Sequence, residues 1–87
     1  MTGSYNISIR RSAEKELRRL SKAEIPHLVE KIKGLSENPR PASSKMLQGE
    51  EKYRRLRVGN YRIIYGIDDS AKAVMIVKIG HRKEVYS

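Results

Sequence analysis

The first alternation of apolar and polar residues runs over positions 5–10. Apolar side chains stand at Tyr5, Ile7 and Ile9, with polar residues between them. A period of two is that of a strand with one buried face, so the pattern predicts a strand at 5–10.

Two helical patterns follow this strand. Ser12 suits a helix N-cap, and apolar residues recur behind it at helical spacing. Ser21 and Glu24 fit an S-x-x-E capping box, and Pro26 fits the first turn of a second helix that ends at 38–41. The apolar positions of the two helices are Ala13, Leu17 and Leu20, and then Ile25, Leu28, Val29, Ile32 and Leu35.

The second half of the chain predicts a long loop and then three strands. The loop covers 38–52, an unusual length for a small domain. Strands are expected at 53–58, 61–67 and 73–79, and Gly59-Asn60 is a hairpin turn signal. The predicted order is β-α-α-β-β-β, an α+β fold in which a helical hairpin packs on one face of a small, mostly antiparallel sheet.

A two-residue turn at Gly59-Asn60 determines which side chains share a face. Val58 should lie opposite Tyr61, and Arg57 opposite Arg62, because cross-strand partners point to the same side of a sheet. Like charges placed directly opposite each other are destabilising, so an anion is expected between these guanidiniums; the alternatives are that they splay into water or that an acidic partner covers them. The face toward the helices is predicted to carry Leu56, Val58, Tyr61, Ile63 and Ile67, and the open face Tyr53, Arg55, Arg57 and Arg62.

Composition narrows the class of protein. The 87 residues predict one domain over 1–87. The formal charge of +9 indicates a polyanionic partner, and the segment from Lys52 to Ile67 carries five basic residues and no acidic one. There is no cysteine, the two histidines lie far apart, and no apolar stretch is long enough for a membrane span, so we expect a cytoplasmic protein without metal or cofactor.

Cleavage of RNA needs neither a metal nor a cofactor. The 2′-hydroxyl can attack the adjacent phosphate if a protein aligns it, neutralises the phosphate oxygens and moves two protons. Arginine suits the charge, and His81 is the natural proton carrier. In the tail, Arg82 adds a cation and Tyr86 can stack on a base. The further candidates for phosphate binding are Lys52, Arg54, Arg55, Arg57 and Lys83.

Two segments carry a family resemblance. Residues 53–65, YRRLRVGNYRIIY, resemble the central hairpin of RelE-type toxins, and 79–86, IGHRKEVY, resemble the closing strand and tail of that family. The resemblance implies a toxin of a type II toxin–antitoxin pair, an endoribonuclease that cleaves mRNA in the ribosomal A site. It also implies an acidic antitoxin partner, in a complex that binds operator DNA through the antitoxin.

The resemblance also implies roles for individual residues. Arg55 and Arg57 match the basic residues of the family's sheet, and Arg62 matches its phosphate-stabilising arginine. Arg82 matches the arginine of the closing turn, and Tyr86 the tail tyrosine. Some members have lysine where Arg55 stands; since arginine is a poor general base, proton transfer is expected of His81.

Three alternatives remain at this stage. A ParE-type toxin shares the fold but poisons DNA gyrase. A nucleic-acid-binding module would need the basic face but no proton carrier, so substitution of His81 would separate it from an RNase. The third is an inactive family member that only binds its antitoxin.

Overall fold

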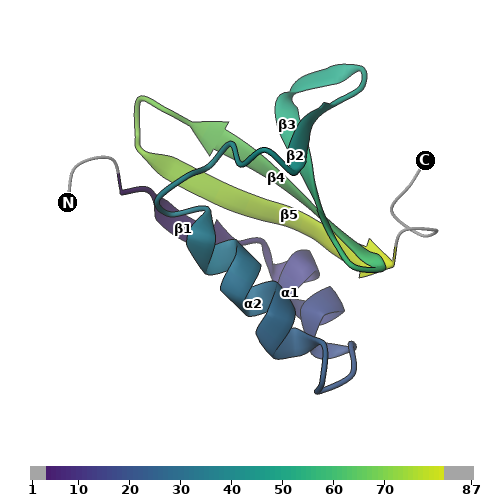
Figure 1. Cartoon of the computed structure of the whole chain (residues 1–87). Coiled ribbons are helices and arrows are strands. Elements are labelled where there is room, and N and C mark those ends of the chain that lie inside the picture. Colours follow the sequence, from purple (N-terminus) through teal and green to yellow (C-terminus); the bar gives the residue numbers. More distant parts are fainter. Residues whose placement is uncertain (1–3, 82–87) are drawn as a thin grey trace.

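The computed structural model describes residues 4–81 and is shown in Figure 1. Within these residues the chain forms a five-stranded sheet and two helices. In chain order the elements are β1 (Asn6–Ile9), α1 (Arg11–Arg18), α2 (Ile25–Gly34), β2 (Ser44–Leu47), β3 (Glu50–Val58), β4 (Tyr61–Asp68) and β5 (Ala73–His81).

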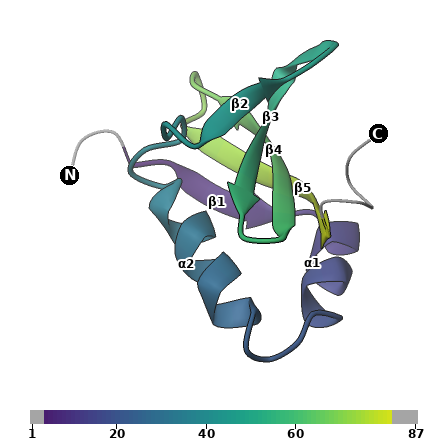
Figure 2. The ribbon, with the colours of Figure 1, turned by 45° about the vertical axis from the view of Figure 1, so that its right-hand side comes forward.

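The sheet is mixed, with the strand order β1-β5-β4-β3-β2. β1 runs parallel to β5, and the two helices and the other three strands lie between them in the sequence. Parallel neighbours need such a long connection. The other neighbours are antiparallel, and Figure 2 shows both helices on the same side of the sheet. The predicted α+β class and the helical layer on one face are therefore confirmed.

The core lies between the helices and the sheet. The apolar stripe predicted for each helix is the stripe that is buried, and Tyr65 adds the largest fully buried side chain from β4. Neither helix of the described residues is long and apolar enough to cross a membrane. The buried apolar residues of the core are Ala13, Leu17, Leu28, Ile32, Leu35, Leu56, Val58, Ile63, Tyr65, Val74, Ile76 and Ile79.

The loop predicted at 38–52 is wrong in its second half, where β2 forms and β3 begins at Glu50. β2 is a short edge strand whose residues do not alternate, with Ser44 buried and Met46 exposed. Gly49, with φ of 85°, makes the tight turn into β3. β2 is therefore a strand because it pairs with β3, and its own sequence pattern does not predict it.

The predicted helix caps are also wrong. α1 begins at Arg11 after Arg10, and α2 begins at Ile25 after Glu24, in both cases without a side-chain cap. The Arg10 amide instead donates to the carbonyl of Ile76 on β5, at 2.9 Å, so tertiary pairing sets the start of α1. Pro26 lies in the first turn of α2, as predicted.

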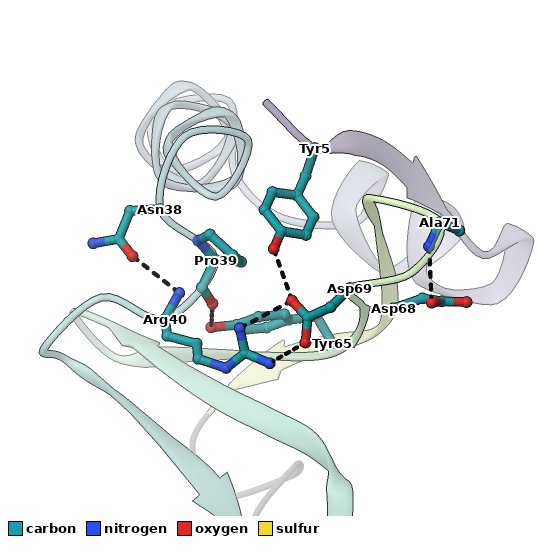
Figure 3. Close-up of polar contacts among 8 residues, drawn as sticks. All are labelled: Tyr5, Asn38, Pro39, Arg40, Tyr65, Asp68, Asp69 and Ala71. Carbon is teal, nitrogen blue, oxygen red and sulfur yellow. Dashed lines mark hydrogen bonds and ion pairs between the residues drawn. The ribbon is translucent and has the colours of Figure 1, made fainter. Parts of the chain in front are cut away.

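A polar cluster joins three distant segments at the end of the sheet near the turn between β4 and β5. The Asp69 cluster (Tyr5, Arg40 and Asp69) is shown in Figure 3. Arg40 donates to both oxygens of Asp69, at 3.2 and 2.9 Å, and the Tyr5 hydroxyl donates at 2.7 Å. The hydrogen bonds from Arg40 and then Tyr5 lower the pKa of Asp69 to about 2.

The hydrogen bond between Tyr5 and Asp69 raises the pKa of Tyr5, and the bond with Asp69 likewise raises that of Arg40. Beside this cluster, the buried Tyr65 hydroxyl donates to the carbonyl of Pro39 at 2.8 Å (Figure 3). The segment after α2 is thus held to β4 and to the turn that follows it.

Candidate nucleic-acid interface

The β3–β4 hairpin places three arginines together. Arg57 pairs opposite Arg62, and Arg55 lies opposite Ile64, as the two-residue turn predicted. Cross-strand partners share a face, so these side chains lie on the face of the sheet away from the buried core residues Leu56 and Ile63. We call Arg55, Arg57 and Arg62 the arginine face.

The arginine face lies in a basic stretch of the sequence. No ion pair joins Arg55 or Arg57 to a carboxylate among the side chains that the structure describes. Nearby in sequence there is no acidic residue between Lys52 and Ile67. The repulsion between facing guanidiniums makes this surface a favourable place for phosphate, which each guanidinium can bind with two N–H donors.

The three arginines differ in exposure. Arg57 is exposed and Arg55 half-buried, but Arg62 is only 9% exposed, so the expectation of three open guanidiniums is wrong for Arg62. Arg62 lies on the central strand β4, between Arg57 on one side and Gly80 of β5 on the other. A guanidinium held in this low-dielectric position interacts with an approaching phosphate more strongly than an exposed one.

His81 ends β5 and is half-buried. It pairs opposite Tyr61, and the two rings meet edge to face with centroids 5.7 Å apart. Arg62 pairs with the preceding residue, Gly80. The structure therefore brings Arg62 and His81 to the same end of the sheet, while the alternation of the strands points them to opposite faces.

The other candidate cations are more scattered. Arg54 lies on the helix side, opposite Tyr65, and donates to the hydroxyl and carbonyl oxygens of Ser44 at 3.1 and 3.3 Å. It therefore joins β2 to β3 and stands apart from the arginine face. Lys52 is exposed, with its ammonium 5.5 Å from the centre of the Tyr53 ring. Arg82, Lys83 and Tyr86 lie outside the described residues.

A hollow of about 410 Å³, lined in part by Ile64, the β4 partner of Arg55, was not foreseen from the sequence. The half-buried Tyr53 ring forms part of its wall and lies over Gly66, where an added Cβ would come within 3.4 Å of the ring. The register could have predicted this packing, because Tyr53 pairs with a residue that has no side chain. The lining residues are Arg10, Ser12, Glu16, Leu47, Glu50, Tyr53, Ile64, Val77 and Lys78.

Comparison with known proteins identifies relatives over nearly the whole chain. A family model described as "ParE toxin of type II toxin-antitoxin system, parDE" matches residues 7–86. Toxin RelE of Mycobacterium tuberculosis is 31% identical, over 94% of this chain and 86% of the relative. The mRNA interferase toxin RelE of Escherichia coli K12 is 30% identical, over 97% of this chain and 92% of the relative.

Solved structures show the same fold. The toxin in the RelBE2 toxin–antitoxin complex of Mycobacterium tuberculosis superposes with a TM-score of 0.83 at 30% identity, covering 94% of this chain and 95% of that one. The archaeal RelE–RelB complex of Pyrococcus horikoshii gives a TM-score of 0.81 at 28% identity, covering 91% and 96%. Sequence, fold and the arginine-rich hairpin agree, and this chain belongs to the RelE-type toxins of the RelE/ParE superfamily, whose members come from type II toxin–antitoxin systems.

Proposed function

We propose that this toxin is an endoribonuclease that cleaves mRNA in the ribosomal A site by attack of the 2′-hydroxyl on the scissile phosphate. The observation that carries the proposal is the arginine face, where Arg57 and Arg62 face each other across β3 and β4 within a stretch, Lys52 to Ile67, that has no acidic residue. A relative with 30% identity is named an mRNA interferase, which supports the same chemistry here.

In this mechanism the arginines carry the charge. Arg62, the most buried of the three, binds the non-bridging oxygens as negative charge develops, and Arg55 and Arg57 hold neighbouring phosphates. The proposal uses no metal ion, because the arginines neutralise the phosphate oxygens and the RNA supplies its own nucleophile.

The chain's C-terminal end provides proton transfer and base contacts in the proposal. His81, at the end of β5, is the proposed proton carrier; strand alternation points its side chain to the face opposite Arg62, and the edge-to-face contact with Tyr61 stabilises its ring orientation. Arg82 and Lys83 contribute further charge, and Tyr86 stacks on a base of the codon. Lys52 strengthens the attraction of the surface for RNA.

An acidic antitoxin is the proposed protein partner. The solved relatives from Pyrococcus horikoshii and Mycobacterium tuberculosis are toxin–antitoxin complexes, and the net charge of +9 favours an acidic segment over the arginine face. The complex would reach operator DNA through the antitoxin. The toxin would act on ribosomes in the cytoplasm.

Gyrase poisoning is the second candidate function, because the matching family model describes a ParE toxin. The fold is shared, so the fold cannot separate the two activities. A gyrase supercoiling assay tests this alternative. A module that only binds nucleic acid is the third candidate; it would keep its affinity for RNA in a His81→Ala variant and would have no cleavage rate to lose.

The experiment adds purified, antitoxin-free toxin to ribosomes stalled with a defined A-site codon and maps the 5′ ends of the mRNA by primer extension. We expect a cut within that codon, a 2′,3′-cyclic phosphate on the upstream product, and a much weaker cut with Arg62→Ala. No cut by a folded wild-type protein would contradict the proposal, and inhibition of supercoiling in the parallel assay would favour the gyrase alternative.

A further inference from the structure

The last part of β5 lacks a strand neighbour on its outer edge within the described residues. β1 pairs with β5 only as far as Ile9 opposite Ile76, and the Arg10 amide makes the final bond, to the Ile76 carbonyl. The chain then turns into α1. The residues of β5 that lead to His81 therefore extend beyond the parallel strand that supports their beginning.

A side chain of α1 takes the place of the missing strand. Glu16 Oε1 accepts a hydrogen bond from the backbone N–H of Ile79 at 2.8 Å. Its other carboxylate oxygen lies 3.4 Å from the Lys78 ammonium. Ile79 is 1% exposed, so without Glu16 its N–H would be a buried donor that has lost its acceptor.

The bond lies close to an irregularity in the pairing of β5 with β4. The pairing of β4 with β5 shifts between Ile64 and Tyr65, which leaves Val77 as an extra residue in β5. The Glu16 contact follows this irregularity by two residues. Glu16 is itself carried on a helix whose neighbouring residues, Ala13 and Leu17, are buried in the core.

We infer that Glu16 is a positioning residue for the proposed site, acting through the backbone of Ile79. By fixing Ile79, Glu16 sets the register that places Gly80 beside Arg62 and His81 beside Tyr61. Gly80 offers no side chain for packing, so the backbone bond just before it adds to the β4 pairing that holds the strand end. The expected effect of Glu16 on catalysis rests on the proposed function, whereas its effect on the position of Ile79 and His81 does not.

The structural test measures amide hydrogen exchange at Ile79 and the ring signals of His81 by NMR in four variants. Glu16→Ala removes the acceptor, and Glu16→Asp keeps the charge but shortens the side chain so that it no longer reaches. Both should speed exchange of the Ile79 amide by about tenfold or more and shift the His81 ring signals. Glu16→Gln retains an acceptor oxygen and Lys78→Ala removes only the ion pair, so both should resemble the wild type.

The functional test uses the ribosome assay on the same proteins. We expect kcat to fall about 10- to 100-fold in Glu16→Ala and Glu16→Asp, with KM for the ribosome nearly unchanged, and to recover in Glu16→Gln. If Glu16→Ala does not fold, Glu16→Asp gives the same readings.

Two results would overturn the inference: unchanged Ile79 exchange and His81 signals in Glu16→Asp, or an equal loss in Lys78→Ala, which would assign the effect to the ion pair. If the wild type cuts no RNA, the proposed function fails, while the exchange and ring signals still decide whether Glu16 positions this strand.

Discussion

The arginines near the two ends of β4 have opposite electrostatic surroundings. Beyond the Asp68 end, Arg40 is bound by both oxygens of Asp69, and Tyr5 donates to the same carboxylate (Figure 3). At the Tyr61 end, Arg62 faces a second arginine, Arg57, and the stretch from Lys52 to Ile67 that contains both has no acidic residue. The first arrangement supplies its own counter-charge and joins segments, whereas the second places two guanidiniums opposite each other, where an external anion would reduce their repulsion.

The comparison shows that the basic composition is not spread at random. Arg40 joins segments of the fold and has Asp69 against it, whereas Arg57 lies opposite another arginine on a surface suited to phosphate. Changes at the exposed Arg57 and the half-buried Arg55 should therefore alter RNA cleavage with little loss of stability. Changes at the Asp69 cluster should do the reverse.

The largest expected effect is that of Arg62→Ala. Loss of a fixed donor to developing charge should lower the cleavage rate in the ribosome assay by about 100- to 1000-fold. Arg62→Lys keeps the charge but not the fork of N–H donors, so it should restore only part of the rate. A rate within twofold of the wild type for Arg62→Ala, in a protein with an unchanged circular dichroism spectrum, would remove Arg62 from the mechanism.

The second-largest expected effect is that of Tyr65→Phe, and it is an effect on stability. Its hydroxyl donates to the Pro39 carbonyl in a fully buried position, so removal leaves that carbonyl without its partner. We expect a loss of about 1–3 kcal/mol in the free energy of unfolding, measured in urea. The cleavage rate, measured where the variant is fully folded, should stay unchanged. A large fall in that rate would contradict the assignment of this end of β4 to stability alone.

Arg57→Ala should weaken binding to RNA through electrostatics alone. Removal of one phosphate contact should reduce the slope of log affinity against log salt concentration by about 1. The matched control is Arg40→Ala, which removes an arginine already bound to Asp69 and should leave the slope as it is. Equal slopes for the two variants would contradict a special role for the arginine face.

Asp69→Asn should give the smallest effect, and one that depends on pH. The pKa of Asp69 is about 2 in the folded protein, below its ordinary value of 3.8, so the carboxylate stabilises the fold fully only well above pH 3.8. This contribution is lost as the pH falls through 3.8 toward about 2. The difference in unfolding free energy between the wild type and Asp69→Asn should therefore shrink over that range, and a difference that stays constant would contradict the cluster.

Much of the fold could be predicted because its signals are local. The helical stripes through Leu28 and Ile32 and the turn at Gly59-Asn60 each depend on neighbouring residues, and both are confirmed. β2 and the helix starts could not be predicted, because pairing with β3 and the bond from Arg10 to Ile76 come from distant parts of the chain.

The candidate site likewise has features that could be predicted from local sequence and features that could not. The hairpin register brought Arg57 opposite Arg62 as predicted, since a two-residue turn fixes it. The burial of Arg62 and the bond from Ile79 to Glu16 depend on β5 and α1, which the hairpin pattern does not contain. The roles of Arg82, Lys83 and Tyr86 stay predictions.

The most direct test of the arginine face is an NMR titration of the arginine Nε–H signals with a short RNA whose 2′-hydroxyls are methylated, so that it binds but cannot be cleaved. The account predicts that the signals of Arg55, Arg57 and Arg62 shift together as the RNA is added, while that of Arg40 stays in place. Movement of Arg40 without the other three, or no shift at any arginine up to millimolar RNA, would contradict it.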